Sequence, residues 1–321
     1  MEVWGKFKAG ITAAALAGLV VFSAQPASAQ TMVKVADPDW TGGLITCRII
    51  EFIIKDWGYE VKRIPIVSGP SVMESVRAGE THYGCEAWPS FTELKEKFVG
   101  KFGGDGSVVY LGEVGIVGKS GYYVPRYLVA GDKARKIKAK APKLKSWKGL
   151  NKHKKLFATR LTGSDGLLLG CPVETWSCED KARMRDLKLE FEAKSAGSEA
   201  AHWRAVRSAY EKGKPFLAYA WEPHWIHAEL DLVPVELPEY SKEAWPATGW
   251  RPDVPFNFAN RAFVKKHPQV AELIKNVRLS NAQQSEMMHQ VDVKKRGVDE
   301  VVQEWMARNK DAWQAWLPSG A

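Results

Sequence analysis

Four of the 14 tryptophans lie in loops or directly after predicted strands: Trp40, Trp88, Trp176 and Trp221. The face of an indole ring attracts a cation within about 6 Å, an interaction worth roughly 0.5–2 kcal/mol. A quaternary ammonium group has no N–H to donate, so an aromatic box is the natural way to bind it. Each tryptophan alone is better explained by core packing, but their shared placement predicts a site for a methylated ammonium compound.

The segment 216–225 (FLAYAWEPHW) indicates how such a site is built. It begins as a short apolar run, which is typical of a buried strand, and it ends in bulky and polar groups. Ligands of open α/β sheets bind outside the carboxyl ends of the strands. We therefore expect Trp221 at a small-molecule site, with His224 as an added hydrogen-bond donor, although a single histidine is more often structural.

Two turns are expected to receive an anionic end of the ligand. Gly42 and Gly43 open a predicted helix, where free backbone N–H groups and the helix dipole favour anions. Residues 162–166 (TGSDG) form a similar turn, after which we expect another helix. The acidic residues Glu86 and Asp165 are expected near the box, where they either offset a cationic ligand or cap local structure.

The order of predicted elements indicates an α/β protein with two lobes. Strands and helices alternate over residues 32–87, which is the pattern of a parallel sheet covered by helices, and the same pattern returns over 156–222. A Gly-rich stretch at 118–121 suits a hinge, and a strand at 256–263 is expected to rejoin the first lobe. Two lobes joined by two crossovers are expected to close on a ligand about a hinge.

The expected boundaries are a signal sequence at 1–29, lobe I at 30–120, lobe II at 121–232, and a return segment with C-terminal helices at 233–321. The expected strands are 32–36, 59–66, 83–87, 108–111, 156–158, 187–191, 216–220 and 256–263. The expected helices are 44–57 with Thr41 as N-cap, 71–78, a segment after Gly166, a segment ending at Tyr210, 270–277, 282–291 and 298–316.

The N-terminus has the pattern of a secretion signal. Lys6 and Lys8 precede an apolar stretch at 11–22, and 27–29 (ASA) is a cleavage motif. We expect cleavage after Ala29 and a periplasmic protein. No cysteine lies beside the cleavage site, so no lipid anchor is expected.

The formal net charge is +9 and the isoelectric point is about 9.2. Most of the excess lies in the lysine-rich stretch 133–155, which is expected to be a solvated helix-and-loop face. Export argues against a nucleic-acid partner, although a basic chain is otherwise compatible with one.

The four cysteines are an even number in an oxidising compartment. Cys171 and Cys178 flank a short loop (CPVETWSC) and are expected to bridge locally, which leaves Cys47 and Cys85 as the second pair. Four cysteines allow three pairings. No CxxC motif or histidine cluster accompanies them, so no metal site is expected.

No enzyme motif competes with a binding site. The chain has no G-x-S-x-G elbow, P-loop or H-E-x-x-H motif. We therefore expect a protein that is not an enzyme and that carries no cofactor.

Five motifs together resemble the glycine betaine/choline family of ABC-transporter substrate-binding proteins, over essentially the whole mature chain. They are DWT at 39–41, EAWPS at 86–90, GYYVPRYLV at 121–129, TGSDG at 162–166 and WEPHW at 221–225. The resemblance implies a type II periplasmic-binding-protein-like fold with a ligand cleft between two α/β lobes. It also implies a membrane permease and its ATPase as partners.

The resemblance makes Trp40, Trp88 and Trp221 cage walls, and it places Ser164 and Asp165 near the polar end of the ligand. The chain departs from the family pattern in two places. Choline binders tend to have aspartate where this chain has Gly42, and the Cys171–Cys178 segment with Trp176 is an addition. Trp176 is therefore predicted to be a fourth wall.

These observations predict the substrate-binding component of an ABC importer for a quaternary ammonium osmolyte, with glycine betaine first. Trimethylamine N-oxide, choline, carnitine and dimethylsulfoniopropionate stay open as ligands. Two other classes also stay open. An exported enzyme would show turnover, and a sugar-binding module would need more planar polar side chains beside its aromatic rings.

Overall fold

A computed structural model of the protein describes residues 31–319. The predicted signal sequence and the cleavage after Ala29 lie outside the described residues. Within the described part of the chain, no helix combines the length and the apolar character that a membrane span requires.

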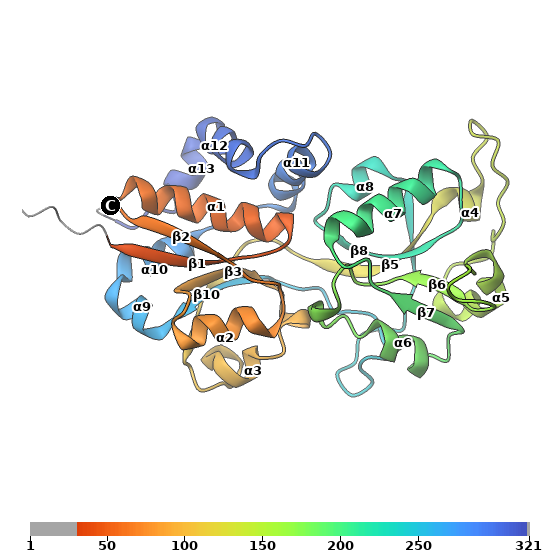
Figure 1. Cartoon of the computed structure of the whole chain (residues 1–321), viewed down its shortest axis with the longest axis horizontal. Helices are drawn as coiled ribbons and strands as arrows, with labels where there is room; N and C mark the ends of the chain where they lie inside the picture. The colour runs from red at the N-terminus through yellow and green to blue at the C-terminus, as the bar shows by residue number, and fades with distance from the viewer. Residues whose placement is uncertain (1–30, 320–321) are drawn as a thin grey trace, which may run out of the picture. The chain divides into compact units, whose positions relative to one another are not determined.

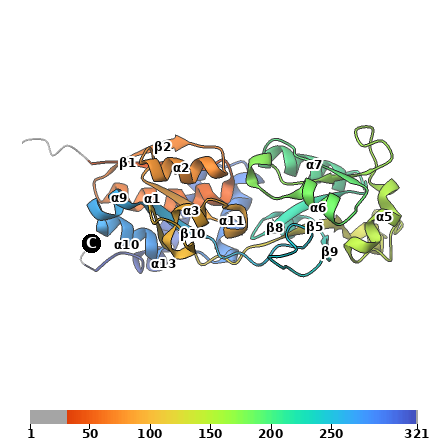
Figure 2. The same cartoon turned by 90° about the horizontal axis from the view of Figure 1, so that it is seen from below.

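The strands form two five-stranded mixed sheets, each with its own helices, which confirms the α/β class (Figures 1 and 2). We call the elements around the first sheet lobe I and those around the second sheet lobe II. The first sheet has the order β2-β1-β3-β10-β4 and the second the order β7-β6-β8-β5-β9. In lobe I, α1 and α11 lie on one side of the sheet and α2 on the other (Figure 1).

Lobe I contains the strands β1 (Met32–Asp37), β2 (Glu60–Pro65), β3 (Tyr83–Ala87), β4 (Val108–Glu113) and β10 (Phe256–Asn260). Its helices are α1 (Thr41–Asp56), α2 (Pro70–Ala78), α3 (Lys95–Phe98), α9 (Arg261–Lys266), α10 (Pro268–Asn276), α11 (Asn281–Asp292), α12 (Val298–Arg308) and α13 (Lys310–Gln314). Strands β1, β2 and β3 are parallel, and β10 enters antiparallel between β3 and β4. The predicted return of the chain to the first lobe is thus confirmed.

Lobe II contains the strands β5 (Lys119–Pro125), β6 (Gly166–Leu169), β7 (Phe191–Lys194), β8 (Leu217–Glu222) and β9 (Leu232–Val235). Its helices are α4 (Arg126–Ala130), α5 (Leu150–His153), α6 (Asp180–Asp186), α7 (Glu199–Glu211) and α8 (Ile226–Glu229). Strand β9 pairs with β5 in this sheet. The chain therefore leaves the second sheet after Val235. The lobe boundaries expected at 120/121 and 232/233 remain a prediction.

The structure corrects several local expectations. The strand expected at 187–191 is β7, which begins only at Phe191, and the helix expected at 298–316 is divided into α12 and α13. Thr41 is the first helical residue of α1, and the extended residue Trp40 is its N-cap. Residues 156–158 do not form a strand, since a 3₁₀ turn ends at Leu156 and only an isolated bridge joins Ala158 to Gly166. No helix follows the TGSDG turn, because the apolar run Gly166–Leu169 pairs in parallel with β7 and β8.

Helix α1 positions much of the site. Its isoleucines at 45, 49, 50, 53 and 54 recur at helical spacing and are buried. Gly58 follows its end with φ at +85°, a conformation that glycine adopts without strain. Because α1 begins at Thr41, shortly after β1 ends at Asp37, the start of the helix lies at the carboxyl end of β1.

Candidate functional site

A cavity of about 110 Å³ lies between the two lobes, at the carboxyl ends of β1, β3 and β8. Both lobes contribute to its wall, which is mostly apolar. The described residues that line it are Ala36, Pro38, Trp40, Ser68, Gly69, Val72, Met73, Cys85, Glu86, Ala87, Trp88, Phe91, Thr92, Trp176, Tyr219, Trp221 and Phe258.

The structure brings the four predicted tryptophans together at this cavity. The ring centroids of Trp40 and Trp88 are 6.2 Å apart, and those of Trp40 and Trp176 are 6.4 Å apart. Trp176 lies 5.6 Å from Trp221. These three pairs meet at interplanar angles of 77°, 69° and 73°, so successive rings form walls at nearly right angles. Such an arrangement can present indole faces to a compact cation from several sides.

Two glycines make room for the indole ring of Trp40. A Cβ at Gly42 would lie 2.5 Å from the Trp40 ring, and one at Gly43 would lie 2.8 Å from it. Any side chain at Gly42 would push Trp40 out of place. Glycine at position 42 is therefore required by the packing of Trp40.

Trp176 reaches the cavity on a loop closed by the Cys171–Cys178 disulfide. The Thr175 hydroxyl donates to the Ser68 carbonyl oxygen of lobe I at 2.7 Å. A Cβ at Gly69 would meet the Thr175 carbonyl oxygen at 2.6 Å, so this loop lies directly against lobe I. The indole Nε1 of Trp176 is buried and donates to no acceptor among the described residues.

Glu86 is the only charged residue among those that line the cavity in the described part of the chain. Its carboxylate accepts hydrogen bonds from Thr46 Oγ1 at 2.6 Å, Gln284 Nε2 at 2.7 Å and Trp88 Nε1 at 3.2 Å. Burial raises its pKa to about 7, although these three donors oppose the rise. A cation in the cavity would lower this pKa again, because it favours the ionised carboxylate.

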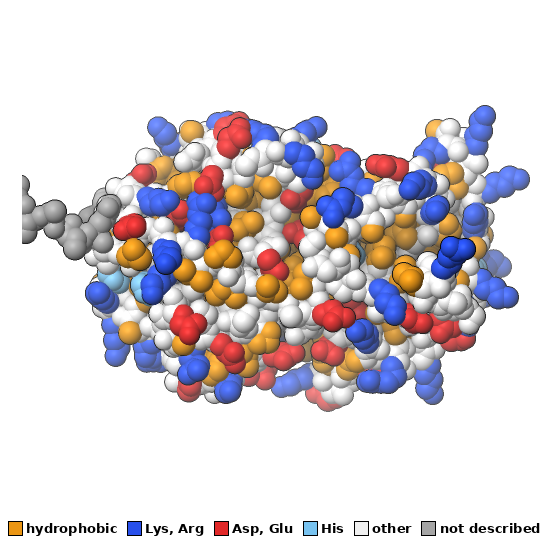
Figure 3. Space-filling model, viewed as in Figure 1, with side chains coloured by type: hydrophobic (Ala, Val, Ile, Leu, Met, Phe, Trp, Pro, Cys, Tyr) orange, Lys and Arg blue, Asp and Glu red, His pale blue; other side chains and the backbone are white. Residues whose placement is uncertain are grey.

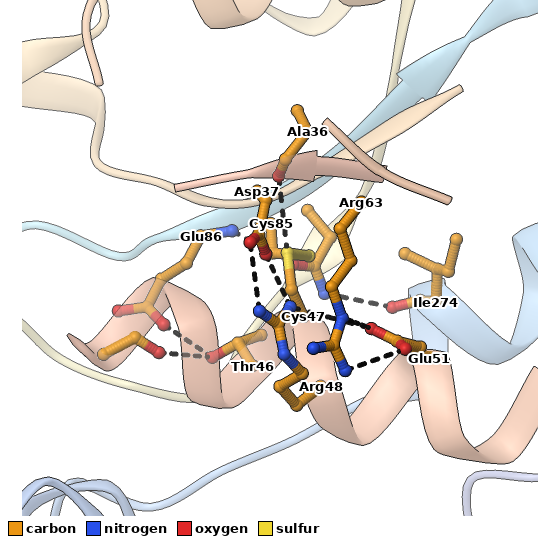
Figure 4. Close-up of a disulfide and its surroundings, with 12 residues drawn as sticks. Ala36, Asp37, Thr46, Cys47, Arg48, Glu51, Arg63, Cys85, Glu86 and Ile274 are labelled. Carbon is orange, nitrogen blue, oxygen red and sulfur yellow. Dashed lines mark hydrogen bonds and ion pairs between the residues drawn. A yellow bond between two sulfur atoms is a disulfide. The ribbon is translucent and has the colours of Figure 1, made fainter. Parts of the chain in front are cut away.

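The backbone at Glu86 is held in an unusual conformation. Its φ of +58° is uncommon for a residue with a side chain. The Glu86 amide donates to Asn257 Oδ1 at 3.1 Å. The preceding residue, Cys85, forms the disulfide to Cys47 on α1 (Figure 4). Strand β3 is thus tied to α1 beside the carboxylate, and both predicted disulfide pairs are present in the structure.

The start of α1 is occupied by a carboxylate of lobe II. Glu199 Oε2 accepts from the Thr41 amide at 3.0 Å, and Glu199 Oε1 accepts from His224 Nε2 at 3.1 Å. His224 Nδ1 accepts from the Ile226 amide, so the proton of the neutral ring lies on Nε2. Burial raises the pKa of Glu199 to about 7 and lowers that of His224 to about 3.

A second carboxylate crosses between the lobes in the opposite direction. Asp292, at the end of α11 in lobe I, accepts from Trp225 Nε1 of lobe II at 2.8 Å. Its other oxygen accepts from Thr41 Oγ1 at 2.7 Å. Each lobe thus supplies one carboxylate to a buried network that joins the lobes beside the cavity.

The predicted site residues fall into two groups. Trp40, Trp88, Trp176, Trp221 and Glu86 line the cavity. The remaining predicted residues lie outside its lining: Thr41, Gly42, Gly43, Ser164, Asp165 and His224.

The two predicted anion-binding turns have other roles. At the N-terminus of α1 the Thr41 amide donates to the Glu199 carboxylate, and Gly42 and Gly43 lie outside the cavity lining. Ser164 and Asp165 precede β6 at its amino end, away from the carboxyl edge of the sheet, and Asp165 pairs with Lys154 at 3.4 Å. His224 is bonded within the inter-lobe network.

Several cavity residues were not predicted from the sequence. Tyr219 lies two residues before Trp221 on β8, so the period-2 alternation of a strand could have indicated it. Phe91 lies in the turn after Pro89, where no pattern marks it. Thr46 and Gln284 hold Glu86 from helices that are distant in sequence, and nothing in their local sequence signals that role.

Two groups of side chains in the described residues have the composition of metal ligands. In the group Cys171, Cys178 and Asp180, both sulfurs are engaged in a disulfide. In the group Glu199, His224 and Asp292, every polar side-chain atom has a hydrogen-bond partner. Neither group supports a metal site.

Loss of one inter-lobe hydrogen bond should weaken ligand binding. Trp225→Phe removes the donor to Asp292 and leaves the Asp292 carboxylate partly unsatisfied, so we expect an affinity roughly five- to tenfold lower. Trp313→Phe is the matched control, because its Nε1 bonds to Met306 within lobe I. Titration calorimetry of both variants checks this, and equal affinities for the two would contradict it.

Comparison with known proteins identifies the family. The family described as the substrate binding domain of ABC-type glycine betaine transport systems matches residues 31–308. The chain belongs to this family. A trimethylamine N-oxide-binding protein of Pelagibacter ubique (strain HTCC1062) is 25% identical over 308 residues, which cover 89% of this chain and 91% of that protein.

Solved structures share the fold. The glycine betaine/L-proline-binding protein of Borrelia burgdorferi matches with a TM-score of 0.72 at 15% identity, over 90% of this chain and 97% of that one. A lactococcal protein in its closed conformation with glycine betaine matches with a TM-score of 0.67 at 15% identity, over 90% of this chain and all of that one. The predicted family and the two-lobed binding-protein fold are therefore confirmed.

Proposed function

We propose that this protein captures trimethylamine N-oxide in the tryptophan-lined cavity and delivers it, in the periplasm, to a membrane permease and its ATPase. The observation that carries the proposal is a box of indoles backed by one buried carboxylate, in a cavity without a basic side chain among its described lining residues.

The cationic head of the ligand accounts for the walls and for Glu86. Methyl groups on a quaternary nitrogen pack against indole faces and gain cation–π attraction, which is strongest in a desolvated site. The Glu86 carboxylate supplies the opposite charge behind Trp88, to which it is hydrogen-bonded.

The polar end of the ligand decides between trimethylamine N-oxide and glycine betaine. A carboxylate needs a cation or several N–H donors. At the helix terminus expected to supply them, Glu199 takes the Thr41 amide, and Gly42 and Gly43 lie outside the cavity lining. The TGSDG turn also lies away from the cavity. A single N-oxide oxygen needs fewer donors, and Trp176 Nε1 is a buried donor without a protein acceptor in the described chain.

The relative from Pelagibacter ubique supports this choice, because it is a trimethylamine N-oxide-binding protein aligned over nearly the whole of both chains. Glycine betaine, the first choice from the sequence, is the second candidate, and the description of the family favours it. The enzyme and sugar alternatives have less support, since the family consists of substrate-binding domains and the cavity is poor in planar polar side chains.

Titration calorimetry against trimethylamine N-oxide, glycine betaine, choline, carnitine and dimethylsulfoniopropionate tests the proposal. We expect trimethylamine N-oxide to bind at least about tenfold more tightly than glycine betaine, a difference of about 1.4 kcal/mol. Tighter binding of glycine betaine would overturn the choice of ligand and keep the importer function. Absence of binding by all five to folded protein would overturn both.

A further inference from the structure

The positive charge of the chain is concentrated in one segment of lobe II. Residues 131–155 contain ten lysines and one arginine against a single aspartate, a net charge of +10. The whole chain carries +9, so the remainder is close to neutral. Figure 3 shows basic side chains gathered where Figure 1 places α4 and α5.

With one exception, these cations are exposed and have no acidic partner among the described residues. Of the eleven, only Lys154 has a carboxylate within ion-pair distance among the described residues, namely Asp165 and Glu190. The other ten are all exposed. Ordinary surface charges are mixed in sign, and a single-sign group of this size produces a field that attracts polyanions.

The segment is folded, although it lacks long helices and strands. Ala141, Leu144 and Leu150 are buried in the core of lobe II. The Arg135 guanidinium lies 5.2 Å from the rings of both Tyr127 and Tyr210. The backbone bonds reciprocally between Asp132 and Ile137, and farther along the Trp147 amide donates to the Glu236 carbonyl oxygen. The lysines are therefore displayed on a fixed framework, unlike those of a mobile tail.

The composition favours a lipid surface over a protein partner. Protein interfaces are enriched in arginine and depleted in lysine, because arginine makes directed, paired hydrogen bonds. Clusters of lysine instead bind anionic headgroups through their summed field. Leu161, which is 79% exposed, lies in the adjoining loop, which is joined to Lys154 by the ion pair between Lys154 and Asp165. An apolar side chain beside a lysine cluster is a common feature of peripheral membrane contact.

We propose that this surface, residues 131–155 together with Leu161, docks the protein on an anionic phospholipid bilayer. Docking would hold the binding protein close to the membrane in which its permease resides. This inference goes beyond the proposed function and does not depend on which ligand fills the cavity.

Vesicle co-sedimentation tests the proposal. The wild-type protein should sediment with vesicles of phosphatidylcholine and phosphatidylglycerol at low salt, and it should stay in solution with phosphatidylcholine alone or at high salt. The variant with Lys133, Lys138, Lys140 and Lys143 replaced by glutamine should bind at least about tenfold more weakly.

The control changes Lys62, Lys265, Lys266 and Lys310 of lobe I to glutamine, which are also exposed and have no acidic partner within the described residues. It alters the net charge equally and should change vesicle binding by less than about twofold. Both variants should keep the wild-type ligand affinity, which shows that they are folded.

Three results would overturn the proposal. The first is absence of binding to anionic vesicles by folded wild-type protein at low salt. The second is an equal loss in both lysine variants. The third is a variant of residues 133–143 that still binds lipid but is no longer captured by the permease in neutral proteoliposomes. That result would assign the surface to a protein partner.

Discussion

Replacing Trp40 by alanine is expected to weaken binding of trimethylamine N-oxide by roughly 30-fold, or about 2 kcal/mol. Trp40 has two other walls, Trp88 and Trp176, as edge-to-face neighbours. Its loss would remove one cation–π contact and admit water to the faces of both neighbours. Trp40→Phe should recover part of the affinity, because a phenyl ring keeps a weaker quadrupole.

Trp176→Ala should cause a loss of similar size, since Trp176 lies between Trp40 and Trp221 and carries the unpartnered Nε1. Trp147→Ala is the matched control, because Trp147 is also half-buried but does not line the cavity. Calorimetric titration measures all four variants. Unchanged affinity in Trp40→Ala and Trp176→Ala would exclude the box as the ligand site.

The second large effect is expected from Glu86→Gln, which should weaken binding of trimethylated ligands by at least about 30-fold. The substitution keeps the size of the side chain and removes the only charge among the described residues of the cavity lining. The trimethylated nitrogen would then enter a desolvated site whose described lining carries no opposite charge.

The Glu86 effect should depend on pH in a defined direction. Burial raises the Glu86 pKa to about 7 in the ligand-free protein, and a bound cation lowers it, so binding releases a proton below about pH 7. The affinity of the wild type relative to Glu86→Gln should therefore be largest above pH 7 and fall as the pH decreases. The comparison with the variant removes contributions from Glu199 and Asp292, which are present in both proteins.

Asp253→Asn is a control for the loss of a buried carboxylate. Burial raises the pKa of Asp253 to about 6, it bonds to Ser90, and it does not line the cavity. The ratio of the wild-type affinity to the Asp253→Asn affinity should show little change across the same pH range. A ratio for Glu86→Gln that is flat or rises toward low pH would rule out an ionised Glu86 as the partner of the ligand cation.

The alternation of elements and the aromatic motifs at strand ends were sufficient to predict the two sheets, the return of β10 and the walls of the cavity. These features depend on local pattern, because strands and helices bury faces of fixed period. The errors in the predicted helices and strands were also local. Residues 166–169 are too short an apolar run to distinguish helix from strand without the neighbours β7 and β8.

The sequence alone placed indoles and one acidic residue where strands end, and hence predicted a site for a methylated cation. Only the tertiary structure decided which protein groups are available to the anionic end of a ligand. Glu199 lies 158 residues from Thr41 in the chain, yet it accepts from the Thr41 amide at the helix terminus where a ligand carboxylate was expected. A backbone donor shows in the sequence, but whether a distant side chain already satisfies it depends on how the two lobes pack.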